Sequence, residues 1–456
     1  MANMILGPII GGLSHEQVNL WARADKAATL HAWLGTKSNG SDARLAGKTQ
    51  LKAVNGFAGI VPIKKLKSDK KYFFALTLTP SLPPPKAAYR PFRTFPEPGK
   101  AKSFRFAFGS CFLPMRNQPG LAFKHMREQQ KDLSFLLMLG DQIYADDLEF
   151  NGLGRVPVNA SEYRKVYETT WGNLHHRDLL AQTPAFMMLD DHEIDNDWHW
   201  TDITLQKPDI AWISRLLRKL QVRPKEEQYL STTRVLTGLK ANWEHQAIHA
   251  PAALSPNGPL AYEFEYGAAA FFVMDTRTQR VLNKTQRQLL GEKQWKKLEE
   301  WLLKVKVSHS VKFIVSSISI LTDIVGDPTN DRWGGFKQER ERLLKFISDH
   351  EIKGIYFLVG DLHSAHALSA EVINTGGEKL PIKQFCSSPF EQKPANFTTF
   401  LDHPAQSSFL QNQKRHFSIS KINYGVVNVD FSDKKNPQVR FELNYEKDGI
   451  WKVQSD

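Results

Sequence analysis

The spacing of hydrophobic and polar residues changes near residue 97, and the two parts of the chain predict different architectures. Before it, stretches such as "QVNLWARAD" and "YFFALTLTP" alternate like half-buried strands, and the loop "TKSNGSDARLAG" is rich in turn-forming residues. Tyr72 follows Leu66 in a pattern typical of the tyrosine that closes a strand corner in a β-sandwich. Residues 1–97 are therefore expected to form an all-β domain of the immunoglobulin or fibronectin type. The proline-rich stretch 80–102 is the predicted linker.

From residue 103 onward, short apolar stretches alternate with amphipathic ones, which predicts an α/β domain over residues 98–456. The predicted strands are "SFRFAF", "LSFLLML", "AFMML", "AAFFVM", "VKFIVSS" and "IYFLV". Helices are predicted where apolar residues recur at three- and four-residue spacing, over 121–131, 161–182, 208–221, 285–306 and 336–350. The final stretches "YGVVNVDFS" and "VRFELNYEKDGIWKVQ" are expected to form a closing hairpin.

Composition narrows the class of protein without changing this picture. The chain has 456 residues and is 41% hydrophobic, which is enough for a large core. No window approaches the roughly 18 consecutive apolar residues of a membrane span, and two cysteines do not make a disulfide framework. The amino terminus lacks the basic region and the cleavage site of a secretion signal. We therefore expect a cytoplasmic protein, with an exported or periplasmic form of a longer chain as the alternative.

The net charge of +12 favours encounters with phosphate-bearing or other anionic partners. The favoured interpretation is a solvated basic surface, and the most basic segment, 213–228, has the pattern of an amphipathic helix with its charged side in water. A dedicated nucleic-acid face is the alternative. No stripe of Lys and Arg interleaved with aromatic residues supports it.

Chemically active side chains follow five of the predicted strands, each at the carboxyl end of its strand. These residues are Cys111, Asp141, Tyr144, Asp190, Asp191, His192, Glu193, Asp275, Arg277, Asp361, His363 and His366. Ligands of open α/β sheets bind outside the carboxyl ends of the strands, so these side chains are expected to share one rim. A single Gly-Asp turn is more often structural than catalytic, but the repetition of the pattern from strand to strand favours a site.

So many carboxylates at one rim would repel each other and raise their pKa values unless cations balance them. A thiolate and a phenolate together with a carboxylate and an imidazole suit a charge-dense transition metal such as iron. A set of Asp oxygens suits a hard ion such as calcium, magnesium or manganese. The sequence therefore predicts two unlike metals that share a bridging Asp, an arrangement used to hydrolyse phosphate esters. A mononuclear iron oxygenase would need two His and one carboxylate, and the excess of Asp argues against it.

Seven blocks of the chain, in order, resemble the alkaline phosphatase D (PhoD-like) family within the calcineurin-like phosphoesterase superfamily. The blocks are "FGSC", "GDQIYADD", "DDHEIDNDW", "MDTRTQR", "LGEKQWKKLEEWL", "DRWGGFKQERERLL" and "GDLHSAH". The resemblance extends over nearly the whole chain. It implies a four-layer αββα metallophosphatase core, in which two mixed sheets are flanked by helices, together with an amino-terminal β-sandwich.

The resemblance also implies which residues bind the metals. The residues that match ligands of a ferric iron are Cys111, Asp141, Tyr144 and His363. Asp141 would bridge to a calcium ion, with Asp191 and Asp361 completing the calcium side. Mn²⁺, Mg²⁺ or Zn²⁺ are alternatives for this second site, although the shortage of nitrogen ligands favours calcium.

Two further residues match catalytic roles of the superfamily. His192 is similar to the imidazole that binds the phosphoryl oxygen or protonates the leaving alcohol, and Arg277 is similar to a phosphate clamp. The structural alternative for His192 is a side chain satisfied by Glu193 or Asp195. The alternative for Arg277 is an ion pair with Asp275.

The resulting hypothesis is a metal-dependent phosphoesterase with an Fe–Ca type binuclear centre. It would hydrolyse phosphodiesters, phosphomonoesters or both by direct attack of a metal-activated hydroxide. The expected partner is a small phosphate ester, including a nucleotide or a nucleic-acid-like phosphodiester, and no obligate protein partner is expected. The alternatives are an inactive relative that binds anionic polymers through its basic surface, and a metalloenzyme of different chemistry on the same site.

Overall fold

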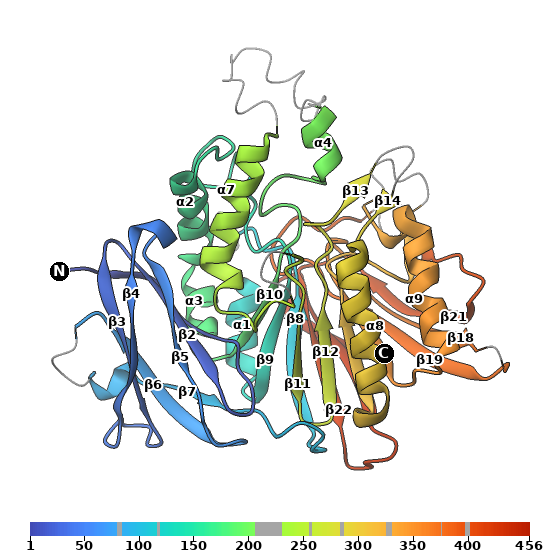
Figure 1. The fold of residues 1–456 in the computed structure, drawn as a ribbon, viewed down its shortest axis with the longest axis horizontal. Helices are drawn as coiled ribbons and strands as arrows, with labels where there is room; N and C mark the ends of the chain where they lie inside the picture. Colours follow the sequence, from blue (N-terminus) through green and yellow to red (C-terminus); the bar gives the residue numbers. More distant parts are fainter. Residues whose placement is uncertain are drawn as a thin grey trace.

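The computed structural model describes residues 1–79, 84–115, 119–205, 230–254, 258–282, 287–324, 331–374, 376–396 and 402–456. The helix predicted over 208–221 and the basic segment 213–228 lie outside these residues. Within the described ranges, no helix has the length and apolar character required to cross a membrane. Figure 1 shows an amino-terminal β module beside a larger α/β body.

The amino-terminal module consists of two small antiparallel sheets, as the alternating pattern predicts. The three-stranded sheet has the order β1 (Met4–Gly11), β2 (Val18–Ala24), β5 (Ala58–Ile63). The four-stranded sheet has the order β4 (Arg44–Leu51), β3 (Ala28–Gly35), β6 (Lys71–Thr77), β7 (Arg90–Arg93). The tyrosine corner is confirmed, because the Tyr72 hydroxyl accepts a hydrogen bond from the backbone N–H of Lys67 at 3.0 Å.

The prediction that 80–102 is only a linker is wrong in part. Strand β7 lies inside this stretch and pairs with β6. The rings of Tyr72 and Phe92 stack across this pair with centroids 5.6 Å apart. Phe92 thus gives β7 a buried face. The many prolines of this stretch favour a linker and conceal the strand.

The first sheet of the α/β body has six strands in the order β10 (Ala185–Met188), β9 (Leu133–Leu139), β8 (Phe104–Gly109), β22 (Asn423–Asp430), β23 (Gln438–Lys447), β24 (Ile450–Ser455). Strands β8, β9 and β10 are parallel. The predicted closing hairpin is a three-stranded meander instead. Asp448 and Gly449 have φ of +55° and +78°, so this Asp-Gly pair is a two-residue turn between β23 and β24.

The second sheet has seven strands in the order β11 (Tyr262–Tyr266), β12 (Ala269–Val273), β15 (Val311–Val315), β17 (Ile355–Val359), β19 (Lys379–Cys386), β18 (Ala365–Ile373), β21 (Leu410–Ile419). Its four central strands, from β12 to β19, are parallel. Two small ribbons pair β13 (Val281–Leu282) with β14 (Arg287–Gln288) and β16 (Thr322–Ile324) with β20 (Asp402–Pro404).

The two large sheets pack face to face through phenylalanine side chains. The ring of Phe106 on β8 lies 5.5 Å from that of Phe271 on β12 and 5.3 Å from that of Phe313 on β15. These rings belong to one buried cluster that also includes residues of the amino-terminal module, such as Leu20 and Phe74. Burial of this apolar surface holds the two sheets together, so the carboxyl ends of their parallel strands keep a fixed position relative to each other.

Helices cover the outer face of each large sheet, which confirms the four-layer arrangement. The seven-stranded sheet carries α8 (Gly291–Ser308) and α9 (Lys337–Asp349), which share a cluster with Phe272 and Ile314 (Figure 1). The six-stranded sheet carries α1 (Leu121–Gln129), α2 (Ala160–Trp171) and α3 (Leu174–Leu180), while α4 (Trp200–Leu205) and α7 (Thr232–Asn242) lie towards the loops.

The single helix predicted over 161–182 is two helices. Gly172 ends α2, and the Asn173 side chain then accepts hydrogen bonds from the backbone N–H groups of His175 and His176 at 3.0 and 3.1 Å. This amide caps the first turn of α3 and starts a new helix in another direction.

Candidate metal centre and active site

The predicted site residues come together at the carboxyl ends of the parallel strands of both sheets. Cys111 follows β8, Asp141 follows β9 and Asp191 follows β10, all from the six-stranded sheet. Asp361 and His363 follow β17 of the seven-stranded sheet. The packing of the two sheets therefore assembles the rim, and neither sheet contains all of the donors.

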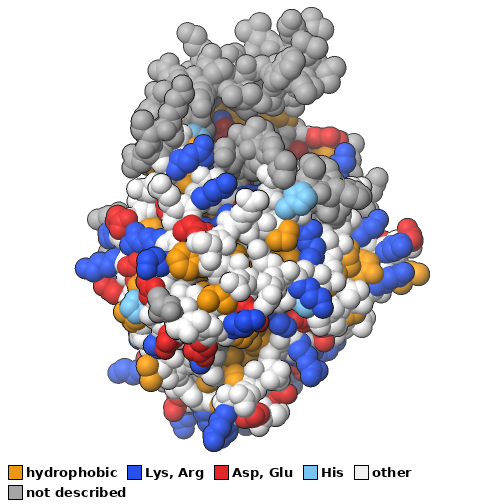
Figure 2. All heavy atoms as spheres, turned by 90° about the vertical axis from the view of Figure 1, so that its right-hand side faces the viewer, with side chains coloured by type: hydrophobic (Ala, Val, Ile, Leu, Met, Phe, Trp, Pro, Cys, Tyr) orange, Lys and Arg blue, Asp and Glu red, His pale blue; other side chains and the backbone are white. Residues whose placement is uncertain are grey.

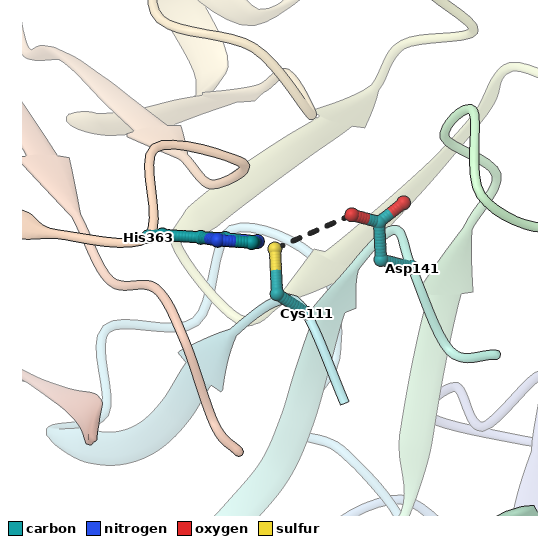
Figure 3. Close-up of side chains that lie close together, drawn as sticks. All are labelled: Cys111, Asp141 and His363. Atoms are coloured by element: carbon teal, nitrogen blue, oxygen red, sulfur yellow. Dashed lines mark hydrogen bonds between the residues drawn. The ribbon is translucent and has the colours of Figure 1, made fainter. Parts of the chain in front are cut away.

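The first donor group consists of a thiol, a carboxylate, a phenol and an imidazole. The Cys111 Sγ lies 3.3 Å from Asp141 Oδ2, and these two side chains and His363 point toward one another from separate segments (Figure 3). The Tyr144 hydroxyl lies 3.2 Å from the same Asp141 oxygen and 3.1 Å from His363 Nε2. Metal–ligand bonds of about 2.0–2.3 Å place neighbouring donors roughly 3–3.5 Å apart, so these separations fit ligands of one ion.

The second donor group contains only carboxylates and shares Asp141 with the first. Asp141, Asp190, Asp191 and Asp361 each offer an oxygen atom, and these atoms all lie within 4.8 Å of one another. Asp190 Oδ2 and Asp191 Oδ1 are buried and accept no hydrogen bond within the described structure. Buried carboxylate oxygens without donors are costly, and a hard cation would satisfy them.

The backbone is bent sharply where the donors project. Cys111, Asp141, Asp361 and His363 have φ of +62°, +54°, +66° and +48°, in the left-handed region that side chains rarely adopt. Such a conformation costs of order 1–3 kcal/mol per residue and persists where the surroundings enforce it, which is typical of functional sites. Gly140 supplies a further left-handed position at +99°, where a Cβ atom would lie 2.3 Å from the Cβ of Asp190.

Burial and mutual repulsion raise the pKa values of several donors, which disfavours their charged forms unless a cation is present. Burial, with the Asp361 charge added, raises the pKa of Cys111 to about 12. Burial and the charges of Cys111 and Asp191 raise the pKa of Asp141 well above its usual range. Burial and the Asp331 charge raise the pKa of Asp361 to about 7. A bound cation reverses this balance by favouring the deprotonated ligands, so the residues fit a metal centre.

His192 points into the same site but is held by a different partner from those predicted. Its Nδ1 lies 2.8 Å from an oxygen of Asp146, and neither Glu193 nor Asp195 satisfies the ring. Burial lowers the pKa of His192, but the charges of Asp146 and Asp191 outweigh burial and raise this pKa well above its ordinary value. The Tyr144 ring packs against the imidazole with centroids 4.2 Å apart. Nε2 is thereby directed away from Asp146.

Arg277 is buried in an ion-pair cluster and does not pair with Asp275 through its guanidinium. Its Nε lies 2.5 Å from Asp190 Oδ1 and its Nη2 lies 2.9 Å from Asp331 Oδ2. Of Arg277, only the backbone N–H is bonded to Asp275, and it donates to Oδ1 at 3.0 Å. Arg280 forms a second ion pair with Asp331. Direct contact between Arg277 and phosphate stays a prediction, and it would use Nη1, which has no partner among the described residues.

A cleft of about 750 Å³ opens beside the donors and is lined by Tyr144, Asp146, Asp147, His192, His363 and residues 392–396. This volume lies within the range of about 300–1,000 Å³ typical of small-molecule sites. Of the described residues that line the cleft, Lys393 is the one lysine or arginine, and it is exposed. No sequence motif points to Lys393, because its segment follows β19 without an Asp or His at the end of the strand.

The chain matches proteins of known family over most of its length. A model described as PhoD-like phosphatase matches residues 106–441. Alkaline phosphatase D of Bacillus subtilis (strain 168) is 25% identical over 344 residues, which are 67% of this chain and 53% of that protein. The chain thus spans about half the length of this curated relative.

Two solved structures share the fold. A structure of PhoD superposes with a TM-score of 0.73 at 18% identity, and the match covers 99% of this chain and 89% of that chain. A purple acid phosphatase from yellow lupin (Lupinus luteus) seeds superposes with a TM-score of 0.61 at 12% identity, over 98% of this chain and 73% of that chain. At these identities the likeness concerns the arrangement of sheets and helices.

Proposed function

The chain belongs to the PhoD-like phosphatase family, and from this premise we propose that it is a metal-dependent hydrolase of phosphodiesters, phosphomonoesters or both. One observation carries the proposal. Asp141 belongs both to a thiol–phenol–imidazole group and to an all-carboxylate group, and its neighbours Tyr144 and His363 line a cleft large enough for a substrate. A carboxylate with two such neighbourhoods is suited to bridge two unlike cations.

The chemistry of the donors supports ferric iron and calcium. Cys111, Tyr144 and His363 offer sulfur, phenolic and nitrogen donors beside Asp141, which suits iron. Asp191 and Asp361 offer oxygen donors within 4.8 Å of Asp141, which suits calcium or another hard ion such as Mn²⁺ or Mg²⁺. Such a metal pair, when bound, supplies Lewis acidity and makes hydroxide available near neutral pH.

His192 is the proposed proton donor or phosphoryl-oxygen ligand. Asp146 holds Nδ1 at 2.8 Å and also accepts the backbone N–H of Asn196 at 3.0 Å, so this carboxylate is itself fixed. The Asp146–His192 pair leaves Nε2 for a substrate oxygen and keeps the ring protonated for donation to a leaving alkoxide.

We propose that Arg277 fixes the positions of the Asp190 and Asp331 side chains. Its guanidinium engages both carboxylates, and the Ser317 hydroxyl donates to Asp190 at 2.9 Å. Asp190 is thereby fixed directly before Asp191, a proposed calcium ligand. On the face shown in Figure 2, Lys and Arg side chains are interspersed with acidic ones, which is typical of a solvated surface and lends no support to a polymer-binding stripe.

Elemental analysis of protein purified without chelator, followed by turnover of bis-p-nitrophenyl phosphate and p-nitrophenyl phosphate, tests the proposal. We expect bound iron together with a second, hard cation, and hydrolysis that a chelated sample lacks. Metal-free protein with no turnover above the chelated control would overturn it.

A further inference from the structure

Two buried serine hydroxyls contact the sulfur of Cys111. Ser110 Oγ and Ser388 Oγ each lie 3.2 Å from Cys111 Sγ. Both serines are at most 1% exposed. Ser110 precedes Cys111 in the loop after β8, whereas Ser388 lies in the loop after β19, in the other sheet.

Ser388 donates to the sulfur, while in the Ser110–Cys111 pair either atom can donate as long as the sulfur carries a proton. Once the sulfur is a thiolate, both hydroxyls are the donors. Ser110 Oγ accepts the backbone N–H of Asp361 at 2.9 Å, and Ser388 Oγ accepts the backbone N–H of His363 at 3.1 Å. The thiol of Cys111 donates its own hydrogen to Asp141 Oδ2. Each hydroxyl has one proton, and the sulfur is the acceptor within reach.

Main-chain hydrogen bonds also hold the loops of Cys111 and Ser388 together, independently of the two serine hydroxyls. Glu391 N–H donates to the carbonyl of Cys111 at 3.2 Å, and Leu113 N–H donates to the carbonyl of Glu391 at 2.7 Å. The loop of Ser388 is thus tied to the loop of Cys111 by main-chain bonds. Gly360 leaves room for Ser110, since a Cβ atom there would lie 2.5 Å from Ser110 Oγ.

We propose that Ser110 and Ser388 are positioning residues for Cys111, which fix the sulfur against the loop that carries Asp361 and His363 and donate to the thiolate when a metal is bound. The inference rests on the proposed function, because it assigns to Cys111 the role of a metal ligand. Donors to a thiolate stabilise the ionised sulfur that binds a metal and fix its position, so such outer contacts raise metal affinity and tune reduction potential.

The test uses Ser110→Ala, Ser388→Ala and the double variant, with Ser387→Ala as matched control. Ser387 is the buried neighbour of Ser388, but its hydroxyl donates to Asn423 at 2.8 Å and not to sulfur. Full-length protein freed of metal is titrated with Co²⁺, and thiolate-to-cobalt charge-transfer absorption is recorded. We expect Co²⁺ affinity to fall about 10–100-fold in the Ser110 and Ser388 variants. The charge-transfer band is also expected to shift, whereas Ser387→Ala stays like the unchanged protein.

Ser388→Thr retains a hydroxyl and is expected to restore the position of the band, which a general packing defect would not allow. Identical bands and affinities in Ser110→Ala, Ser388→Ala and the control would overturn the inference while leaving the proposed function intact. A wild-type protein that binds Co²⁺ without charge-transfer absorption would remove Cys111 from the ligands, and the proposed centre with it.

Discussion

Two acidic clusters lie side by side at the rim, and they differ in what balances their charge. Asp190 and Asp331 are buried against the guanidinium groups of Arg277 and Arg280. Asp141 and Asp361 form no salt bridge with any residue that the structure describes, although Asp141 is equally buried. Arg277 and Arg280 balance the charge of the first cluster, although its member Asp190 also offers an oxygen within 4.8 Å of those of Asp141 and Asp361. Asp141 and Asp361 have no arginine at salt-bridge distance among the described residues, and their oxygens lie at the spacing of metal ligands. The comparison indicates that buried carboxylates at this rim require positive charge, from arginine or from metal.

The largest loss of activity is expected from replacement of Asp141, the carboxylate that belongs to both donor groups. Asp141→Ala removes the carboxylate that belongs to both donor groups, so we expect no detectable turnover of bis-p-nitrophenyl phosphate and a lower melting temperature of the metal-loaded protein. Activity and metal content are measured together. Asp178→Ala, which breaks only a salt bridge with Arg127 on the surface, is the control. Normal turnover by Asp141→Ala would mean that the site has been misplaced.

A smaller loss is expected when the metal donors remain and only the imidazole is removed. His192→Ala is expected to lower kcat by about 10²–10⁴-fold, because proton transfer by a positioned side chain contributes that much. Metal content, measured in parallel, should stay near normal. Asp146→Asn keeps the imidazole but loosens its Nδ1 contact, and a weaker effect on kcat is expected. Loss of metal in His192→Ala would instead make the imidazole a ligand.

The arginine-paired cluster is expected to respond in stability. Arg277→Ala leaves Asp190 and Asp331 buried without this partner, which should cost about 3–5 kcal/mol in the free energy of unfolding. Urea unfolding of the metal-free protein measures it.

Arg93→Ala is the control for this change, since its salt bridge with Asp69 lies at the surface and should contribute at most about 1 kcal/mol. Equal costs for the two variants would contradict the contrast between buried and exposed pairs.

The smallest effect is expected from the exposed cation of the cleft. Lys393→Ala should raise KM for bis-p-nitrophenyl phosphate by about threefold to tenfold with little change in kcat, because an exposed charge contributes roughly 1 kcal/mol to binding an anion. Added salt should shrink the difference between the two proteins. Lys435→Ala, in the exposed turn after β22, is the control. A KM that does not respond would place the substrate elsewhere in the cleft.

The gathering of donors could be predicted because it follows from chain order. Parallel strands of one sheet end at the same edge, so Asp141 and Asp191 had to share a rim once their strands were recognised. Asp361 follows a strand of the other large sheet, and its place at this rim depends on how the two sheets pack. The Asp448–Gly449 turn is also predictable, since Asp-Gly between apolar alternations is a strong hairpin signal, and it explains why the expected closing hairpin has a third strand.

Partners distant in sequence could not be predicted in this way. Asp146 lies much farther from His192 along the chain than Glu193 does. Only the packing of the loops shows that Asp146 is the residue that binds the imidazole. Ser388 contacts Cys111 across 277 positions, and a serine after a strand carries no distinguishing pattern. The pairing of Arg277 with Asp331 likewise depends on how the loops of one sheet meet.

The left-handed backbone at Cys111, Asp141, Asp361 and His363 costs stability, although these residues supply the proposed metal donors. Glycine at any of the four would relax the main chain by about 1 kcal/mol or more while deleting a donor. Laboratory evolution that rewards heat resistance of the metal-free protein should therefore erode these four positions early. Selection in the presence of metal should keep them, because there the donors stabilise the fold through the bound cation.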